Sequence, residues 1–274
     1  MTNVPTVTLS NGTAMPRIGL GTSPMNDADA EQAVNQALEL GYRLIDTAEN
    51  YRNETGVGRA LRQASRDELF VTSKFNKAWH SVDGVRTAFE ASAEKLGVDY
   101  LDLFLIHWPN PDQDQYVDAW RGLIALREAG LVKAIGTSNF KPTHLQRLID
   151  ETGVAPEVNQ IQLSPVWAKE AEREFHAQHG IVTEAWSPLG KGTDLLDNPV
   201  LQDIAKAHGR TPGQVVLRWE SQQDVVPIPK SADPGRLAEN LAIFDFELTA
   251  DQLAALSALD GTAKAAADSD RFGH

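Results

Sequence analysis

The segment Leu44-Ile-Asp-Thr-Ala-Glu-Asn-Tyr51-Arg-Asn-Glu-Thr-Gly-Val-Gly58 joins a short apolar run to the start of a helical pattern. We expect the apolar run to form a buried strand that ends in the carboxylate of Asp46, with Tyr51 in the loop that follows. Two later apolar runs end in the same way, because Phe70-Val-Thr-Ser-Lys74 ends in a lysine and Leu103-Phe-Leu-Ile-His107 ends in a histidine. Strand ends and the loops after them carry the chemistry of a (β/α) barrel, so this segment predicts a fold and a site together.

The same alternation of an apolar run and a helical pattern repeats along the chain. Near-continuous apolar runs are typical of parallel strands that are covered on both faces. Strands are predicted at residues 19–22, 43–46, 70–74, 101–106, 132–137, 157–162, 181–185 and 225–228, and helices at 27–40, 53–63, 82–96, 115–130, 141–151, 169–179 and 233–241. Strand–helix units without a flexible linker predict an α/β fold, a single (β/α)8 TIM barrel that forms one domain over residues 1–274.

A doubly wound open sheet is the alternative fold. It usually opens with a glycine-rich phosphate loop, and the candidate for that loop here, Gly19-Leu-Gly21-Thr, lacks the third glycine. Additions at both ends of the chain also suit the barrel. Asn11-Gly12 between two strand-like runs predicts a β-hairpin, and extra helices are expected near the C-terminus at 197–208, 212–222 and 249–258.

The composition excludes several classes of protein. The chain has 274 residues, a formal net charge of -13 and no cysteine. The negative charge argues against nucleic acid or an anionic membrane as the main partner, and without cysteine there is no disulfide, thiolate nucleophile or cysteine-bound zinc. No signal peptide is evident, and no apolar run approaches the roughly 20 residues of a membrane-spanning helix. A cytoplasmic protein is expected.

Four titratable groups are predicted to meet at one end of the barrel, because the second, third and fourth strands are neighbours. A free tyrosine, with a pKa of about 10, is a poor acid at neutral pH, but a nearby ammonium lowers that pKa. Tyr51 would donate a proton to a carbonyl oxygen, Lys74 would tune its pKa, and Asp46 would hold Lys74. His107 would orient the carbonyl. Each group also has an ordinary alternative role in helix capping, packing or solvation.

Other motifs favour no competing chemistry. His176-Ala-Gln-His179 has the spacing of two metal ligands on a helix, but its polar surroundings favour a solvated helix face, and no metal site is predicted. The chain has no metalloprotease, P-loop or Gly-x-Ser-x-Gly motif, which disfavours acyl hydrolysis.

The second half of the chain offers groups for an anionic ligand. Barrels often bind phosphate with the loops after the seventh and eighth strands and a helix N-terminus, and Lys230, Ser231 and Arg236 lie in that place. An ordinary basic helix start is the alternative. The amides of Asn139 and Gln160 would suit a carboxamide-bearing ring, on which an aromatic side chain at the end of the seventh strand would stack.

These motifs resemble the aldo-keto reductase family, and specifically its bacterial 2,5-diketogluconate-reductase-like group. The resemblance covers nearly the whole chain. Its ordered motifs run from Gly41 to Tyr51, Asn53 to Gly58, Leu101 to Pro109, Ile135 to Phe140, Val158 to Gln160, Trp186 to Gly190 and Ile228 to Ser231. It implies an eight-stranded barrel whose N-terminal hairpin closes the bottom, and NADPH-dependent reduction of aldehydes and ketones.

The resemblance also implies roles for single residues. The catalytic tetrad would be Asp46, Tyr51, Lys74 and His107. The cofactor site would contain Gly21, Thr22, Asp46, Ser138, Asn139, Gln160, Trp186, Ser187, Leu189, Gly190, Lys230, Ser231, Arg236, Glu239 and Asn240. Because Lys230, Ser231 and Arg236 match the site of the adenosine 2′-phosphate, NADPH is expected in preference to NADH.

Departures from the family pattern fall in the substrate pocket, which we expect to include Ser23, Trp79 and Trp108. Many relatives have Leu-Trp-Asn after the catalytic lysine, where this chain has Phe75-Asn76-Lys77, and many have an aromatic residue in place of Ser23. The loss of two aromatic walls predicts a wider or wetter pocket. The expected partner is a small carbonyl compound, such as a dicarbonyl, keto-sugar or simple aldehyde, and the expected state is a monomer.

Two other functions remain open at this point. A non-catalytic subunit that senses nicotinamide nucleotides would keep the cofactor site without turnover. A barrel hydrolase or isomerase would bind phosphosugars at Lys230 and Arg236 and would not depend on a nicotinamide cofactor.

Overall fold

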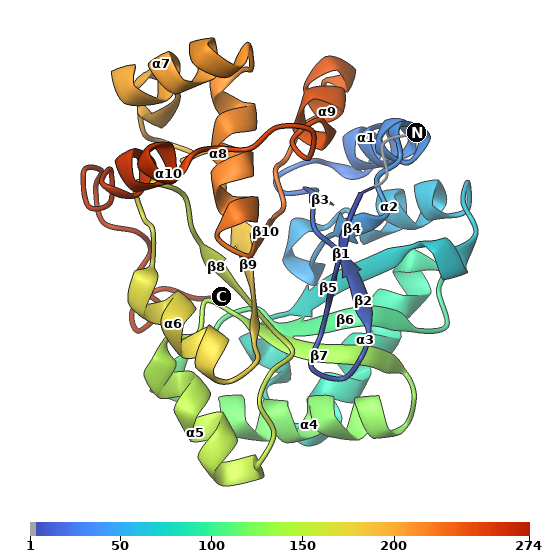
Figure 1. The fold of residues 1–274 in the computed structure, drawn as a ribbon. Helices are drawn as coiled ribbons and strands as arrows, with labels where there is room; N and C mark the ends of the chain where they lie inside the picture. Colours follow the sequence, from blue (N-terminus) through green and yellow to red (C-terminus); the bar gives the residue numbers. More distant parts are fainter. Residues whose placement is uncertain (1–3) are drawn as a thin grey trace.

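A computed structural model describes residues 4–274, and a sheet of eight parallel strands forms its centre. The strands are β3 (Gly19–Gly21), β4 (Leu44–Asp46), β5 (Phe70–Phe75), β6 (Leu101–Ile106), β7 (Val132–Ser138), β8 (Val158–Gln162), β9 (Val182–Trp186) and β10 (Val225–Pro227). Each strand pairs in parallel with the next one in the chain, as the succession of colours in Figure 1 shows. All eight strands predicted from the sequence are confirmed.

The first and last strands meet at a narrow seam that nearly closes the barrel. The backbone N–H of Gly21 donates to the carbonyl of Pro229 at 3.2 Å. A Cβ atom on Gly21 would lie 2.9 Å from the carbonyl oxygen of Ile228, so a residue with a side chain would push the two strands apart. The predicted (β/α)8 barrel is therefore confirmed, and the open doubly wound sheet is excluded.

Helices surround the barrel. Their bounds are α1 (Asp27–Leu40), α2 (Glu54–Leu61), α3 (Val82–Leu96), α4 (Tyr116–Glu128), α5 (Pro142–Thr152), α6 (Glu170–Gln178), α7 (Pro199–His208), α8 (Pro212–Gln222), α9 (Pro234–Leu241) and α10 (Ala250–Ser257). Helix α1 shows why these bounds follow from the sequence. Asn26 accepts a hydrogen bond from the N–H of Asp29 at its start, and Gly41 ends it in a left-handed conformation with φ of 109°.

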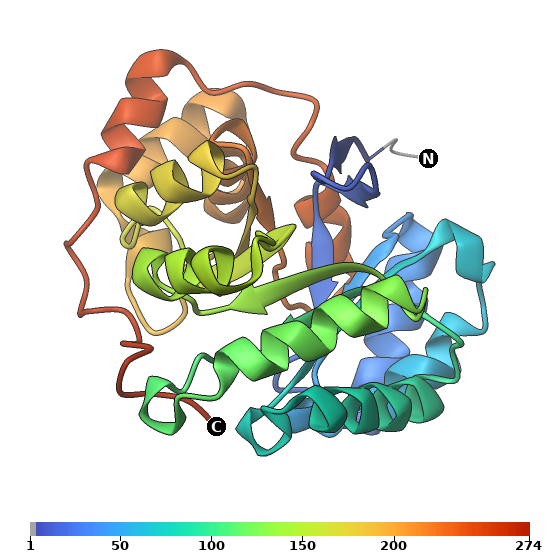
Figure 2. The ribbon, with the colours of Figure 1, turned by 90° about the horizontal axis from the view of Figure 1, so that it is seen from below.

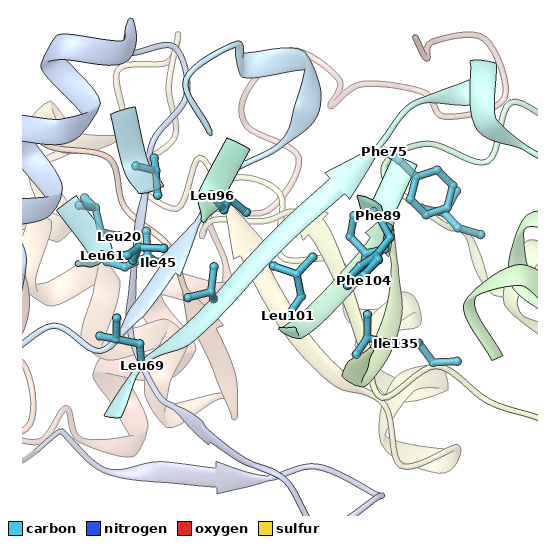
Figure 3. Close-up of a cluster of buried hydrophobic side chains, with 14 of the residues drawn as sticks. Leu20, Ile45, Leu61, Leu69, Phe75, Phe89, Leu96, Leu101, Phe104 and Ile135 are labelled. Carbon is cyan, nitrogen blue, oxygen red and sulfur yellow. The ribbon is translucent and has the colours of Figure 1, made fainter. Parts of the chain in front are cut away.

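Side chains on the strands alternate between the helical layer and the barrel interior. Ile45, Phe104 and Ile135 point outward and pack in one cluster with the helix residues Phe89 and Leu96, which Figure 3 labels. Full burial of each such side chain contributes about 1.5–3 kcal/mol relative to exposure, so this layer supplies much of the stability of the barrel.

The hairpin plugs the amino-terminal end of the barrel interior. Strand β1 (Thr6–Thr8) pairs antiparallel with β2 (Ala14–Pro16). The buried side chains of Leu9 and Met15 join one apolar cluster with inward-facing strand residues. These are Leu44, Phe70, Leu103, Leu105, Ala134, Val158, Val226 and Ile228. The expected closure of the bottom by the hairpin is confirmed. Within residues 4–274, every helix falls short of the length and apolar character that crossing a membrane requires.

Candidate active site

The carboxyl ends of the strands surround a cavity of about 560 Å³. The residues predicted for the site that line this cavity are Gly21, Ser23, Asp46, Tyr51, His107, Trp108, Ser138, Asn139, Gln160, Trp186, Ser187, Leu189 and Lys230. They come together because each strand points alternate side chains inward, and the last inward position of a strand lies at this end. On β4, for example, Leu44 belongs to the inner cluster and Ile45 to the outer one, and Asp46 reaches the cavity.

Lys74 lies beneath the cavity with none of its surface exposed. Its Nζ donates to Oδ1 of Asp46 at 2.7 Å and to the carbonyl of Thr47 at 2.9 Å. Burial by itself would lower the pKa of Lys74, but the Asp46 carboxylate opposes that effect, and the pKa lies above its ordinary value. Lys74 therefore carries a positive charge at neutral pH, as predicted from the sequence.

Tyr51 ends a 3₁₀ helix at Glu49–Tyr51, a turn too short to leave a periodic signal in the sequence. The ammonium of Lys74 donates to its hydroxyl at 3.4 Å. Burial raises the pKa of Tyr51, and Lys74 offsets part of that rise. Lys74 lowers the pKa of Tyr51, as predicted. The prediction that this pKa falls below its ordinary value is wrong, because the effect of burial is larger than the effect of Lys74. Tyr51 is therefore a protonated phenol at neutral pH.

His107 follows β6 and faces Tyr51 edge-on, with 5.8 Å between the ring centroids and 76° between the ring planes. Burial lowers its pKa well below the ordinary value, with a smaller contribution from the charge of Lys74. The ring is thus a neutral imidazole at pH 7, so one nitrogen donates a hydrogen bond and the other accepts one.

Amide side chains connect the two sides of the cavity. Asn139 donates to the carbonyl of His107 and to Oγ of Ser138, both at 3.0 Å, and accepts from the indole N–H of Trp186 at 2.8 Å. Gln160 donates to Oδ2 of Asp46 at 2.9 Å. The amide hydrogens of Asn139 are therefore both used within the protein, and its position is tied to the loop of His107.

A second, smaller depression of about 320 Å³ adjoins the start of α9. Lys230, Ser231 and Arg236 line it, together with Asp233, which caps the helix by accepting from the N–H of Arg236 at 2.9 Å. Lys230 lines both depressions, so one elongated ligand would reach from the main cavity to the cations. Exposed cations beside a helix N-terminus suit a phosphate.

Some predicted residues lie outside both linings. Among the cofactor candidates, the residues outside the linings are Thr22, Gly190, Glu239 and Asn240. Thr22 is buried, and its hydroxyl donates to the carbonyl of Asp46 at 3.0 Å. The expected place of Trp79 in the substrate pocket is not supported, because the cavity lining does not include it. Its indole N–H instead donates to Oε1 of Glu49 at 2.9 Å, which holds the ring against the 3₁₀ helix Glu49–Tyr51.

The C-terminal tail supplies part of the wall that we did not predict by residue. Figure 2 shows the tail, in red, running from α10 along the side of the barrel. The ring of His274 lies 4.9 Å from that of His107, and the ring of Phe272 lies 5.1 Å from that of Trp108. Lys141 holds the tail through Asp268 at 2.6 Å. An Ala-rich tail has no periodicity from which this path would follow.

Glu184 is a second residue near the site that was not predicted from the sequence. It lies inside the apolar strand β9, and the carboxylate in that run was the available signal. Its Oε2 accepts from Nε2 of Gln160 at 2.6 Å.

No group of three or more histidines and acidic residues in residues 4–274 is placed to hold a metal ion. His176 instead shares hydrogen bonds with Asn159 and Thr183, both at 2.9 Å.

Comparisons with known proteins agree with the resemblance seen in the sequence. The Aldo/keto reductase family matches residues 8–260. The chain is 47% identical to the methylglyoxal reductase DkgA of Salmonella typhimurium, with 100% of both chains covered. It is 49% identical to the 2,5-diketo-D-gluconic acid reductase B of a Corynebacterium species, with 95% of each covered.

Solved structures agree with the sequence comparisons. A crystal structure of a Gox0644 mutant in complex with NADPH superposes with a TM-score of 0.95 at 43% identity and covers 99% of this chain and 100% of that one. A Bombyx mori aldo-keto reductase in complex with NADP gives a TM-score of 0.90 at 34% identity, with 96% of this chain and 95% of that one covered. Identity at this level over nearly the whole length reflects common descent as well as a common fold, and the chain therefore belongs to the aldo/keto reductase family of oxidoreductases.

Proposed function

We propose that this protein reduces a small aldehyde or ketone with NADPH, and that Tyr51 is the acid that protonates the carbonyl oxygen. The observation that carries the proposal is the position of the Tyr51 hydroxyl, 3.4 Å from a fully buried ammonium that is itself paired with Asp46. A protonated phenol that faces a cavity and contacts a fixed positive charge is suited to give up its proton as negative charge develops on a bound oxygen.

The cavity fits the reduced nicotinamide cofactor. Gln160 and Ser138 offer polar groups for the carboxamide, and Trp186 offers an aromatic face. Lys230 and Arg236 lie at the adjoining depression, where they would hold the 2′-phosphate that distinguishes NADPH from NADH. NADPH supplies the hydride when it is bound. The comparison proteins support this assignment, because two solved relatives are named as complexes with NADPH or NADP.

The protein's own groups have separate tasks in this proposal. Lys74 stabilises the phenolate that remains after Tyr51 gives up its proton, because its charge contacts that oxygen. Asp46 keeps Lys74 charged and in place. His107, as a neutral imidazole, is able to donate a hydrogen bond to the substrate oxygen without competing as an acid, since burial keeps its pKa low.

The walls of the cavity favour a compact substrate. Trp108, Pro24 and the His274 ring form an apolar and aromatic side, and Ser23 leaves room where an aromatic residue would narrow the pocket. Relatives are named for methylglyoxal and for 2,5-diketo-D-gluconic acid, which are both small and carry adjacent carbonyl or hydroxyl oxygens. We therefore propose small dicarbonyls and keto-sugars as the substrate class.

Loss of reduced-nicotinamide absorbance tests the proposal. The assay compares methylglyoxal, 2,5-diketogluconate and an aryl aldehyde, each with NADPH and with NADH. We expect turnover with NADPH and either small dicarbonyl, and weak turnover with NADH or the aryl aldehyde. Binding of NADPH without reduction of any carbonyl would instead favour a nucleotide-sensing role, and failure to bind NADPH would refute the cofactor assignment.

A further inference from the structure

Glu184 is a buried acid that the proposed reaction does not use. It faces the barrel interior from β9, directly across from its register partner Gln160 on β8. None of its surface is exposed. One carboxyl oxygen accepts from Gln160 at 2.6 Å, and the other, Oε1, has no hydrogen-bond partner in the part of the chain that the structure describes. A buried carboxyl with one partner is costly to fold, and unlike Glu220 this one is bonded to a residue that lines the cavity.

The contacts of Gln160 indicate what that function is. Its amide nitrogen donates to two carboxyl groups, Asp46 at 2.9 Å and Glu184 at 2.6 Å. An amide nitrogen has two hydrogens, so both are used by these carboxyl groups. Gln160 also lines the cavity, and its carbonyl oxygen is the polar atom that remains to face a ligand there. With the amide reversed, that oxygen would point at the Asp46 carboxylate and be repelled.

We propose that Glu184 is a positioning residue which, with Asp46, fixes the Gln160 amide so that its carbonyl oxygen accepts from the carboxamide of the nicotinamide ring. The proposal rests on the function proposed above, since it requires the cofactor in this cavity. It adds that the acidic proton of Glu184 sets the charge beneath the ring. A neutral Glu184 suits the neutral ring of NADPH, and an ionised Glu184 suits the positive ring of NADP⁺.

The charged groups around Glu184 support this second part. Burial, and then the charge of Asp46, raise the pKa of Glu184 to about 8, while its hydrogen bond to Gln160 and the charge of Lys74 oppose the rise. Tyr51 is the other titratable group that the charge of Glu184 reaches, and ionisation of Glu184 raises the pKa of Tyr51. Glu184 is thus neutral at pH 7 and ionises at mildly alkaline pH. Binding of NADP⁺ would release its proton and would tighten as the pH rises.

Cofactor binding tests the positioning role without turnover. Dissociation constants for NADPH are measured at pH 7 by fluorescence for the wild type, Glu184→Leu and Glu184→Gln. Leucine removes the acceptor, and we expect the dissociation constant to rise about tenfold, the effect of one hydrogen bond to a buried amide. Glutamine keeps an acceptor oxygen, and we expect a smaller rise. Glu220→Leu is the matched control, because Glu220 is a fully buried carboxyl without a hydrogen-bond partner among residues 4–274, and it lies outside the cavity lining.

The same measurement with NADP⁺ at a series of pH values tests the role of the proton. For the wild type we expect the dissociation constant to fall about tenfold from about pH 7 to about pH 9, with a midpoint near the pKa of Glu184. For Glu184→Gln we expect no such change, since glutamine does not ionise. An equal fall in both proteins would overturn the role of the proton, even if the leucine variant does not fold.

Thermal unfolding separates a positioning role from a merely structural one. Leucine removes the cost of burying a poorly partnered carboxyl, but it also leaves one amide hydrogen of Gln160 without its acceptor. These two effects oppose each other, so we expect Glu184→Leu to melt within a few degrees of the wild type while binding NADPH more weakly. A parallel loss of melting temperature and affinity would indicate a structural role. If the wild type does not bind NADPH, the proposed function fails. If the wild type binds it and Glu184→Leu binds it equally well, only the present inference fails.

Discussion

The two ends of the barrel interior are built by the same strands and have opposite chemistry. At the amino-terminal end, inward positions such as Leu44 and Val158 pack with Leu9 and Met15 of the hairpin. Two residues further along the same strands, the inward positions are Asp46 and Gln160, which belong to a buried hydrogen-bonded network. Strand alternation places both sets, so the fold alone does not distinguish them.

The difference shows how a barrel separates stability from chemistry. The apolar end needs only correct volume and shape, and many hydrophobic side chains would serve there with small losses. The polar end needs each donor to meet its acceptor, because a buried charge without a partner costs several kcal/mol. We therefore expect substitutions at the two ends to differ in what they damage, and the following variants test that expectation.

Tyr51→Phe should have the largest effect, and it should act on turnover alone. Removal of a positioned acid lowers the rate by about 10²–10⁴-fold. We expect a loss near the upper end of that range in kcat/KM for methylglyoxal, with the dissociation constant for NADPH within about twofold of the wild type. Steady-state kinetics and cofactor fluorescence give the two numbers. A variant that keeps more than about a tenth of the activity would contradict the assigned role.

Lys74→Met should damage both turnover and stability. It leaves Asp46 buried without its counter-charge, which costs about 3–5 kcal/mol in the free energy of unfolding. Urea denaturation measures this loss, and the double variant Lys74→Met/Asp46→Leu should recover most of the stability without activity. The control is Arg86→Met, which breaks an exposed pair with Glu90 and should cost at most about 1 kcal/mol. Equal losses for the two single variants would refute a special cost at the polar end.

Met15→Ala should damage stability without changing the chemistry. The side chain is fully buried in the apolar end, so we expect a loss of about 2–5 kcal/mol in the free energy of unfolding. The kcat per folded molecule should stay within about twofold of the wild type, since the polar network is on separate inward positions. Thr8→Ala, an exposed change in the same hairpin, serves as the control. A large fall in kcat with little loss of stability would show that the two ends are coupled.

The smallest effect is the contribution of His107, at the polar end, to the pH dependence of stability. His107 is neutral in the folded protein because burial lowers its pKa, whereas the unfolded chain binds a proton near pH 6.5. Stability is therefore retained above that pH and falls as the pH drops below it, by up to about 1.4 kcal/mol per pH unit. His107→Asn should flatten this slope in urea titrations, whereas the loss caused by Met15→Ala should not vary with pH. An unchanged slope in His107→Asn would show that folding does not lower the pKa of His107.

The sequence was sufficient to predict the barrel and the residues beneath its cavity. Near-continuous apolar runs marked the strands, and Asp46, Lys74 and His107 stood out because each ends such a run. Their meeting point then followed from the order of strands in a barrel. Their roles in the reaction remain predictions that the variants above will test.

Features fixed by single side-chain contacts were not predictable. The position of Trp79 in the sequence predicts a place in the pocket, but its indole N–H donates to Glu49 of another loop, and the cavity lining does not include it. Lys141 binds Asp268, 127 residues away, and no local pattern reports such a pair. Glu184 was hidden because its neighbours in β9 made the run appear to be an ordinary buried strand.

The seam between β3 and β10 has a consequence for local opening of the barrel. Other neighbouring strands of the barrel are joined by at least three paired residues. At the seam, β3 is joined to the residues after β10 by the hydrogen bond from the N–H of Gly21 to the carbonyl of Pro229. Ser23 and Lys230 lie on opposite sides of this joint and both line the cavity. A ligand that contacts both sides would hold the joint shut. Amide hydrogen exchange at Gly21 should therefore slow on cofactor binding more than exchange within β6, and would report occupancy from the backbone itself.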